Sequence, residues 1–224
     1  MKSRITHEQT KSGWTSAVKI GFLSNLKNAE HEVYRHWLRE HSYAWDELSS
    51  ADDLCNCLLN YDLLIVPPEM ELKKQWANNL STFVKGGQSL LFMSNARSAE
   101  TELLAKTLGY AEMSYENSSS SQRPIRVLNQ HPIVSEFSSG QQLTLKNCMG
   151  NVCVSKNSTT NVIAEYTSLN GKFHIPAIMV NEEKGKVVYL NFQAKDSSPQ
   201  FDTLLRNTIE WLLEPKGLLS NKDA

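Results

Sequence analysis

GGQSLLFMSNAR, residues 86–97, decides the fold of this 224-residue chain. The double glycine ends a helical pattern, because glycine readily adopts the backbone conformation that closes a helix. Ser89–Met93 then forms a short apolar run of the kind that a buried strand shows. The run stops at Ser94–Arg97, where a second helical pattern begins. In α/β proteins ligands bind at the carboxyl ends of the strands, where each strand is followed by a helix, so this corner also bears on function.

Strands and helices alternate outward from this corner through the first half of the chain. Strands are expected in VKIGFLS (18–24), YAWDEL (43–48) and YDLLIVPPEM (61–70). The third strand ends at Pro67, because proline cannot donate a hydrogen bond to a neighbouring strand. Strands that alternate with helices pair in parallel through right-handed crossovers. The pattern therefore predicts a flavodoxin-like, doubly wound sheet with helices on both faces.

Helices are expected in four segments of this half, at residues 29–41, 50–60, 71–87 and 98–110. The third is the clearest, because four apolar side chains recur in it at every fourth position. These are Leu72, Trp76, Leu80 and Val84. Either Gly86 or Gly87 supplies the C-terminal cap of this helix.

The second half of the chain is rich in short segments of β-type composition, which predict a β-rich insertion. They are HPIVSEF, QQLTLKN, NVCVS and NVIAEYTS. A hairpin over residues 175–192 follows, in which Gly185 is expected to take the positive φ of a bulged turn. A C-terminal helix over residues 198–213 closes the domain with an apolar face: Phe201, Leu204, Leu205, Ile209, Trp211 and Leu212.

Composition excludes several classes of partner. The formal net charge is −1 and the basic residues are scattered, which gives no reason to expect a nucleic acid or an anionic membrane surface. The first residues lack the apolar core of a secretory signal, so a cytoplasmic location is expected. Four cysteines do not form a disulfide framework. We expect a polar arm at residues 1–16, a single domain at 17–214 and a tail at 215–224.

Three stretches resemble the class I glutamine amidotransferase-like superfamily, especially its ThuA-like and β-galactosidase-trimerisation-like members. They are the strand–helix–GG–strand unit at residues 61–94, NQHPIVSEF at 129–137, and the closing hairpin and helix at 175–213. With the first strand, the resemblance covers most of residues 18–213. It implies a flavodoxin-like sheet with a β-rich insertion. Packing and turn residues make up each motif, so their order and spacing carry the comparison.

The glutaminase machinery that the resemblance implies is missing from this sequence. Active members place a cysteine in a glycine-flanked turn after the strand that corresponds to SLLFM, with backbone N–H groups as an oxyanion hole. Here that turn reads MSNAR, and PPEM replaces the oxyanion-hole glycines. The His-x-Glu pair expected near the end is replaced by NFQAKDSSP. We therefore predict that the chain is not a glutaminase.

A polar rim at the carboxyl ends of the strands is the candidate ligand site, because open α/β sheets bind ligands there. Its members are Asn25, Glu69, Ser94, Asn95, Arg97, His131 and Gln193. Such a rim suits a small polar ligand such as a sugar. Two structural interpretations stay open: Ser94 and Asn95 as helix N-caps, and His131 as a turn determinant. A catalytic Ser94 needs a base, for which His131 or His174 is available.

The remaining chemically notable residues are better explained by packing. The spacings of Cys55 with Cys57 and of Cys148 with Cys153 are not those of common zinc sites, so buried thiols are expected. His31 and His36 are expected to be exposed on a helix, since they stand five residues apart. Three tryptophans lie on apolar helical faces and are expected in the core: Trp37, Trp76 and Trp211.

These observations predict a non-catalytic amidotransferase-like domain that binds a ligand or assembles with other proteins. Two alternatives remain: a ThuA-like enzyme acting on a sugar or other polar substrate, and an interaction subunit of a larger complex. No metal or other cofactor is expected. Trp14 in the polar arm is a candidate anchor onto a neighbouring protomer, so we also expect a homodimer.

Overall fold

The computed structural model describes the central part of the chain in segments, namely residues 18–24, 31–49, 60–68, 70, 72–93, 100, 104, 108, 113–114, 124–143, 145, 147–149, 153–154, 160–166, 175–194 and 198–214. All structural statements below concern these residues.

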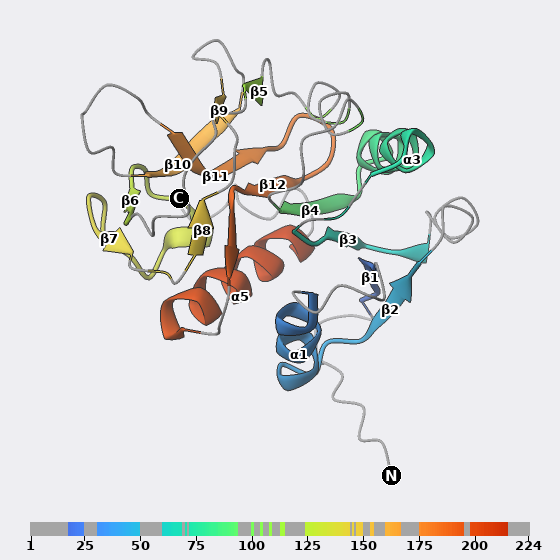
Figure 1. Cartoon of the computed structure of the whole chain (residues 1–224), viewed down its shortest axis with the longest axis horizontal. Helices are drawn as coiled ribbons and strands as arrows, with labels where there is room; N and C mark the ends of the chain where they lie inside the picture. Colours follow the sequence, from blue (N-terminus) through green and yellow to red (C-terminus); the bar gives the residue numbers. More distant parts are fainter. Residues whose placement is uncertain are drawn as a thin grey trace, which may run out of the picture.

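A nine-stranded sheet runs through the molecule in the order β2–β1–β3–β4–β12–β11–β10–β6–β7 (Figure 1). Its strands are β1 (Ile20–Leu23), β2 (Trp45–Leu48), β3 (Leu63–Val66), β4 (Ser89–Met93), β6 (Ile125–Val127), β7 (Gln142–Leu143), β10 (Asn161–Tyr166), β11 (Ile175–Asn181) and β12 (Val187–Leu190). From β2 to β12 all neighbours pair in parallel, and from β12 to β7 they pair antiparallel. The expected mainly parallel α/β sheet with a β-rich second half is confirmed.

Two small sheets accompany the main one. They pair β13 (Phe192–Ala194) with β8 (Asn147–Met149), and β5 (Met113–Ser114) with β9 (Cys153–Val154).

The segment HPIVSEF was expected as a β-type segment, but the structure corrects this: η3 (Pro132–Val134) is a short 3₁₀ helix. His131 caps it, since its Nδ1 accepts from the backbone N–H of Ile133 at 3.3 Å. The proline at its first position also favours a helical start over a strand.

Helices cover both faces of the main sheet (Figure 1). α1 (Glu32–Glu40) and α5 (Pro199–Leu213) pack into the core on one face, and α3 (Lys74–Lys85) packs into the core on the other. The two helices on the first face are joined directly, because Trp37 Nε1 donates to Asp202 Oδ1 at 2.8 Å. The doubly wound arrangement that alternation predicts is therefore present.

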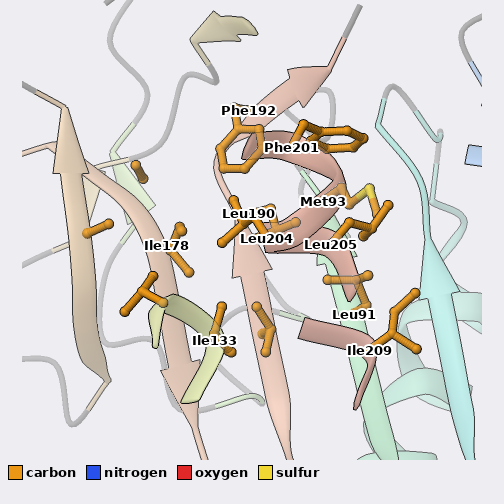
Figure 2. Close-up of a cluster of buried hydrophobic side chains, with 14 of the residues drawn as sticks. Leu91, Met93, Ile133, Ile178, Leu190, Phe192, Phe201, Leu204, Leu205 and Ile209 are labelled. Atoms are coloured by element: carbon orange, nitrogen blue, oxygen red, sulfur yellow. The ribbon is translucent and has the colours of Figure 1, made fainter. Parts of the chain in front are cut away.

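The C-terminal helix α5 packs its apolar face into the core cluster on its side of the sheet (Figure 2). Ser198 starts the helix by accepting a hydrogen bond from the N–H of Phe201, and Pro199 occupies the first turn, where no N–H is needed. Its Leu204 and Leu205 face β4 and β12, which contribute Met93 and Leu190 among others (Figure 2). All six apolar residues predicted for the buried face of this helix are buried: Phe201, Leu204, Leu205, Ile209, Trp211 and Leu212.

Helix α3 matches the spacing that predicts it. Trp76, Leu80 and Val84 are buried in the second core cluster, and Leu72 is buried just before the helix begins. The backbone N–H of Gly86 closes the last turn by donating to the carbonyl oxygens of Thr82 and Phe83. The cap at the double glycine is therefore confirmed.

Gly185 in the β11–β12 turn differs from the expectation. The positive φ values among the described glycines belong to Gly87 and Gly140, so the bulged-turn interpretation of Gly185 was wrong. The turn instead presses against the chain after α3, where a Cβ on Gly185 would lie 2.1 Å from the carbonyl oxygen of Gln88. Glycine is needed here for close approach of two backbones, not for its φ.

Candidate functional site

The carboxyl ends of the parallel strands meet at one edge of the sheet. β1 is followed there by Ser24, β3 by Pro67 and Pro68, and β12 by Asn191. β10 runs in the same direction as β12, because both are antiparallel to β11, so Tyr166 ends at this edge as well. This edge is where open α/β sheets bind ligands.

The predicted rim residues are described only in part. Asn25, Glu69, Ser94, Asn95 and Arg97 follow β1, β3 and β4 closely in the chain and lie outside the described residues. Gln193 belongs to β13, where its backbone pairs with Cys148 of β8. The rim therefore remains a prediction for these six positions.

His131 lies near the amino ends of the strands, on the side of the sheet opposite the predicted rim. This corrects its place in the rim. The His131 ring packs edge-on against the Trp211 ring, with 4.9 Å between the two ring centres. Lys186 Nζ lies 4.7 Å from the centre of the same Trp211 ring. Lys186 directly precedes β12, and its carbonyl accepts from Leu90 near the start of β4, so this cluster belongs to the amino ends of the strands. His131 is thus at the opposite end of the strands from Met93, where β4 ends.

The environment of His131 also disfavours its charged form. Burial is the main cause that lowers the pKa of His131 to about 4, and the nearby Lys186 ammonium acts in the same direction. A histidine with this pKa is neutral near pH 7. With one ring nitrogen accepting from the N–H of Ile133, its observed role is to hold the turn before η3.

A buried arginine organises the end of β1. Arg35 NH2 donates to Ser24 Oγ at 2.5 Å and to Glu47 Oε1 at 2.7 Å, and the guanidinium lies 5.7 Å from the centre of the Phe22 ring. Arg35 is only 9% exposed, so its charge needs these partners. Helical spacing alone gave no reason to bury an arginine on α1, because the partner Glu47 lies on β2, the edge strand.

His31 ties the start of α1 to the turn after β3. The side chain is fully buried, and its Nε2 lies 2.8 Å from the carbonyl oxygen of Pro68. A carbonyl only accepts, so Nε2 carries the proton of this hydrogen bond. The expectation of an exposed histidine was wrong for His31, whereas His36 is exposed and pairs with Glu40.

Asn191 joins three strands of the second half at the same edge. Its side-chain Nδ2 donates to the carbonyl oxygen of Pro176 at 2.9 Å. The backbone carbonyl oxygen of Asn191 accepts from the hydroxyl of Tyr166 at 2.5 Å. Nearby on β10, the buried carboxylate of Glu165 pairs with Arg126 of β6. These contacts fix the strand ends that would carry a ligand.

The described residues offer little for a metal ion or a membrane. No three histidine, cysteine, aspartate or glutamate side chains among them gather as a metal site would need. None of the helices in the described segments has the length and apolar character needed to cross a bilayer. Cys55, Cys57, His174 and Trp14 lie outside the described residues, while Trp37, Trp76 and Trp211 are buried as expected.

Comparison with known proteins identifies the fold and does not identify an activity. No family model matches the sequence, and no curated protein sequence matches it significantly. A ThuA-like protein from Bacteroides uniformis superposes with a TM-score of 0.69 at 12% identity, over 91% of this chain and 95% of that one. A GMP synthase component from Thermoplasma acidophilum gives a TM-score of 0.62 at 12% identity, over 89% of this chain and 96% of that one.

A glutamine amidotransferase from Thermotoga maritima superposes with a TM-score of 0.55 at 12% identity, over 87% of this chain and 84% of that one. The fold is therefore of the class I glutamine amidotransferase-like kind, which the sequence motifs indicate. At these identities the likeness concerns the fold, and fold alone does not define an activity.

Proposed function

We propose that this chain is an amidotransferase-like domain without glutaminase activity that works as a ligand-binding or assembly module. The turn after β3 carries this proposal. Glutaminases of this superfamily need backbone N–H donors at that turn, and Pro67 and Pro68 have none. The carbonyl of Pro68 is held by the buried His31, which anchors the turn to α1.

The corner after β4 supports the same proposal. The strand ends at Met93, and the next four residues are Ser94, Asn95, Ala96 and Arg97, without a cysteine. No thiol nucleophile is therefore present in the sequence where the superfamily uses one.

The ligand that we propose is small and polar, for example a sugar. Five polar residues follow the ends of β1, β3 and β4 in the sequence, and Gln193 follows β12. They are Asn25, Glu69, Ser94, Asn95 and Arg97. Amide, hydroxyl and charged groups of this mixture match the hydroxyls of a sugar, which both donate and accept hydrogen bonds.

A ThuA-like enzyme acting on a sugar or another polar substrate is the second candidate. The TM-score of 0.69 to a ThuA-like protein favours it. Chemistry would then depend on rim groups such as Ser94 with His174 as the candidate base, because His131 lies at the amino ends of the strands. An interaction subunit of a larger complex is the third candidate. For both the assembly module and the interaction subunit we propose a cytoplasmic homodimer.

A melting-shift screen with neutral and acidic sugars tests ligand binding. We expect at least one compound to raise the melting temperature of the full chain in a saturable way. The variant Arg97→Ala should lose this shift, and Arg206→Ala serves as a matched control because Arg206 is an α5 residue whose exposed side chain pairs with Glu136. A shift retained in Arg97→Ala would place the ligand elsewhere, and turnover of the compound would favour the enzyme.

A further inference from the structure

Within the described part of the chain, the outer edge of β2 is open to strand addition. β2 ends the main sheet, and no strand among the described residues pairs with its outer side. Leu48 points its carbonyl inward, accepting from the N–H of Ser24. Because peptide groups alternate along a strand, those of Trp45 and Glu47 point outward. An open edge of this kind is a template for another strand.

The edge carries negative charge and an aromatic surface. Asp46 and Glu47 are exposed, and Tyr43 and Trp45 are half-buried beside them. Glu47 is neutralised in part by Arg35, but Asp46 accepts only from the uncharged hydroxyl of Tyr61 among the contacts described. A strand that adds here should therefore be basic and should bring apolar side chains.

Two copies of β2 do not fit each other. In a twofold antiparallel pairing that sets the outward-pointing Trp45 of one copy opposite the outward-pointing Glu47 of the other, Asp46 would face Asp46 of the other copy. Like charges directly opposite each other on neighbouring strands are destabilising. The edge therefore disfavours its own copy as the added strand.

Residues 1–16 have the complementary chemistry. They contain three basic residues, Lys2, Arg4 and Lys11, against the single acidic Glu8. Ile5 and Trp14 are among the large apolar side chains of this segment and can pack on an aromatic surface. We propose that the segment 1–16 of a second copy adds as a strand to the outer edge of β2. The proposal rests on the assembly part of the proposed function.

Chain connectivity favours a second copy over the same copy. An arm that folded back onto its own edge would run from Val18 across the amino end of β2, where residues 41–44 enter that strand from α1. Folded proteins avoid connections that cross at one end of a sheet. The arm of a neighbour approaches the edge from outside, and a twofold dimer repeats the contact twice.

Hydrogen exchange of the full chain tests the position of the arm. The outward amides of Trp45 and Glu47 should exchange about tenfold more slowly at concentrations where the protein is dimeric than after dilution to the monomer. The inward amide of Asp46 is the internal control, since it faces β1 in both states. Protection that persists in a diluted monomer would place the arm on its own copy and overturn the proposal.

Charge reversal at the edge tests the chemistry of the contact. Asp46→Lys should raise the dimer dissociation constant about tenfold, because the repulsion occurs at both contacts of the dimer. Glu183→Lys makes the same charge change on the exposed β11–β12 turn and should leave the constant unchanged. Adding Lys11→Glu to Asp46→Lys should recover part of the loss. Melting curves of each variant serve to check that the fold is intact.

The outcomes separate this inference from the proposed function. A full-length protein that is monomeric at micromolar concentration removes both the homodimer and the arm contact, but leaves ligand binding standing. A dimer with unprotected Trp45 and Glu47 amides, indifferent to Asp46→Lys, keeps the homodimer and overturns the edge as its interface.

Discussion

His31 Nε2 lies 2.8 Å from the carbonyl oxygen of Pro68, a residue 37 positions later in the chain. This buried hydrogen bond connects the start of α1 with the turn that follows β3, next to the candidate ligand site. It holds the turn through a carbonyl, where a glutaminase would present N–H donors. The contact therefore gives this turn a structural role.

Replacing His31 should destabilise the protein. His31→Leu leaves the carbonyl of Pro68 without its donor in a buried place, which costs roughly 1–3 kcal/mol. Urea denaturation followed by circular dichroism measures the change. His36→Leu is the matched control, because His36 is exposed on the same helix and its pair with Glu40 contributes little. Equal effects of the two variants would contradict the buried contact.

Gly185 should tolerate no side chain. A methyl group at Gly185 would lie 2.1 Å from the carbonyl oxygen of Gln88, so Gly185→Ala must displace backbone and should cost several kcal/mol, about 3 or more. Gly140→Ala is the contrast, because Gly140 has φ 82° and open space around it. Its cost comes from backbone strain alone, about 1–2 kcal/mol. Chemical denaturation should rank the two variants in this order.

Trp76 should be a large contributor to the second core cluster. It is 5% exposed between α3 and the sheet, so Trp76→Ala should cost about 3–5 kcal/mol through the cavity it leaves. The exposed Asn78 on the same helix provides the control, and Asn78→Ala should change the free energy of unfolding by less than about 0.5 kcal/mol. An unchanged denaturation midpoint in Trp76→Ala would refute the packing of α3.

His131 should make stability depend on pH in acid. Its pKa is lowered in the folded state to about 4, below the ordinary 6.5, so the unfolded chain binds this proton more readily. Stability is therefore fully present above pH 6.5 and should fall as the pH drops from about 6.5 to about 4. His131→Gln should flatten the curve in this window. A variant curve as steep as that of the native protein would contradict the buried neutral histidine.

Local patterns were sufficient for the elements that make their own contacts. The apolar run at Ser89–Met93 and the four-residue spacing in α3 report burial directly, because each element packs through one regular face. The antiparallel β11–β12 hairpin followed from alternation on either side of its turn. Such features predict the sheet, its two layers of helices and the β-rich second half.

The missed features depend on contacts between distant segments. His31 is buried because Pro68 lies against it, and Arg35 because Glu47 on a neighbouring strand neutralises it. Gly185 meets Gln88 just before the neighbouring strands β12 and β4 begin, and no local turn preference encodes that approach. His131 was expected in the rim, where it could have served as a base for Ser94, but its segment instead carries it to Trp211 and Lys186 at the amino ends of the strands.

Reaction with a glutamine-analogue electrophile tests the central claim, the absence of a glutaminase nucleophile, most directly. The full-length protein is incubated with the electrophile, with and without glutamine, and the adducts are located by mass spectrometry alongside an assay for ammonia. The account predicts no ammonia above the blank and no adduct at Ser94–Arg97. Stoichiometric labelling of any cysteine that glutamine prevents would contradict it.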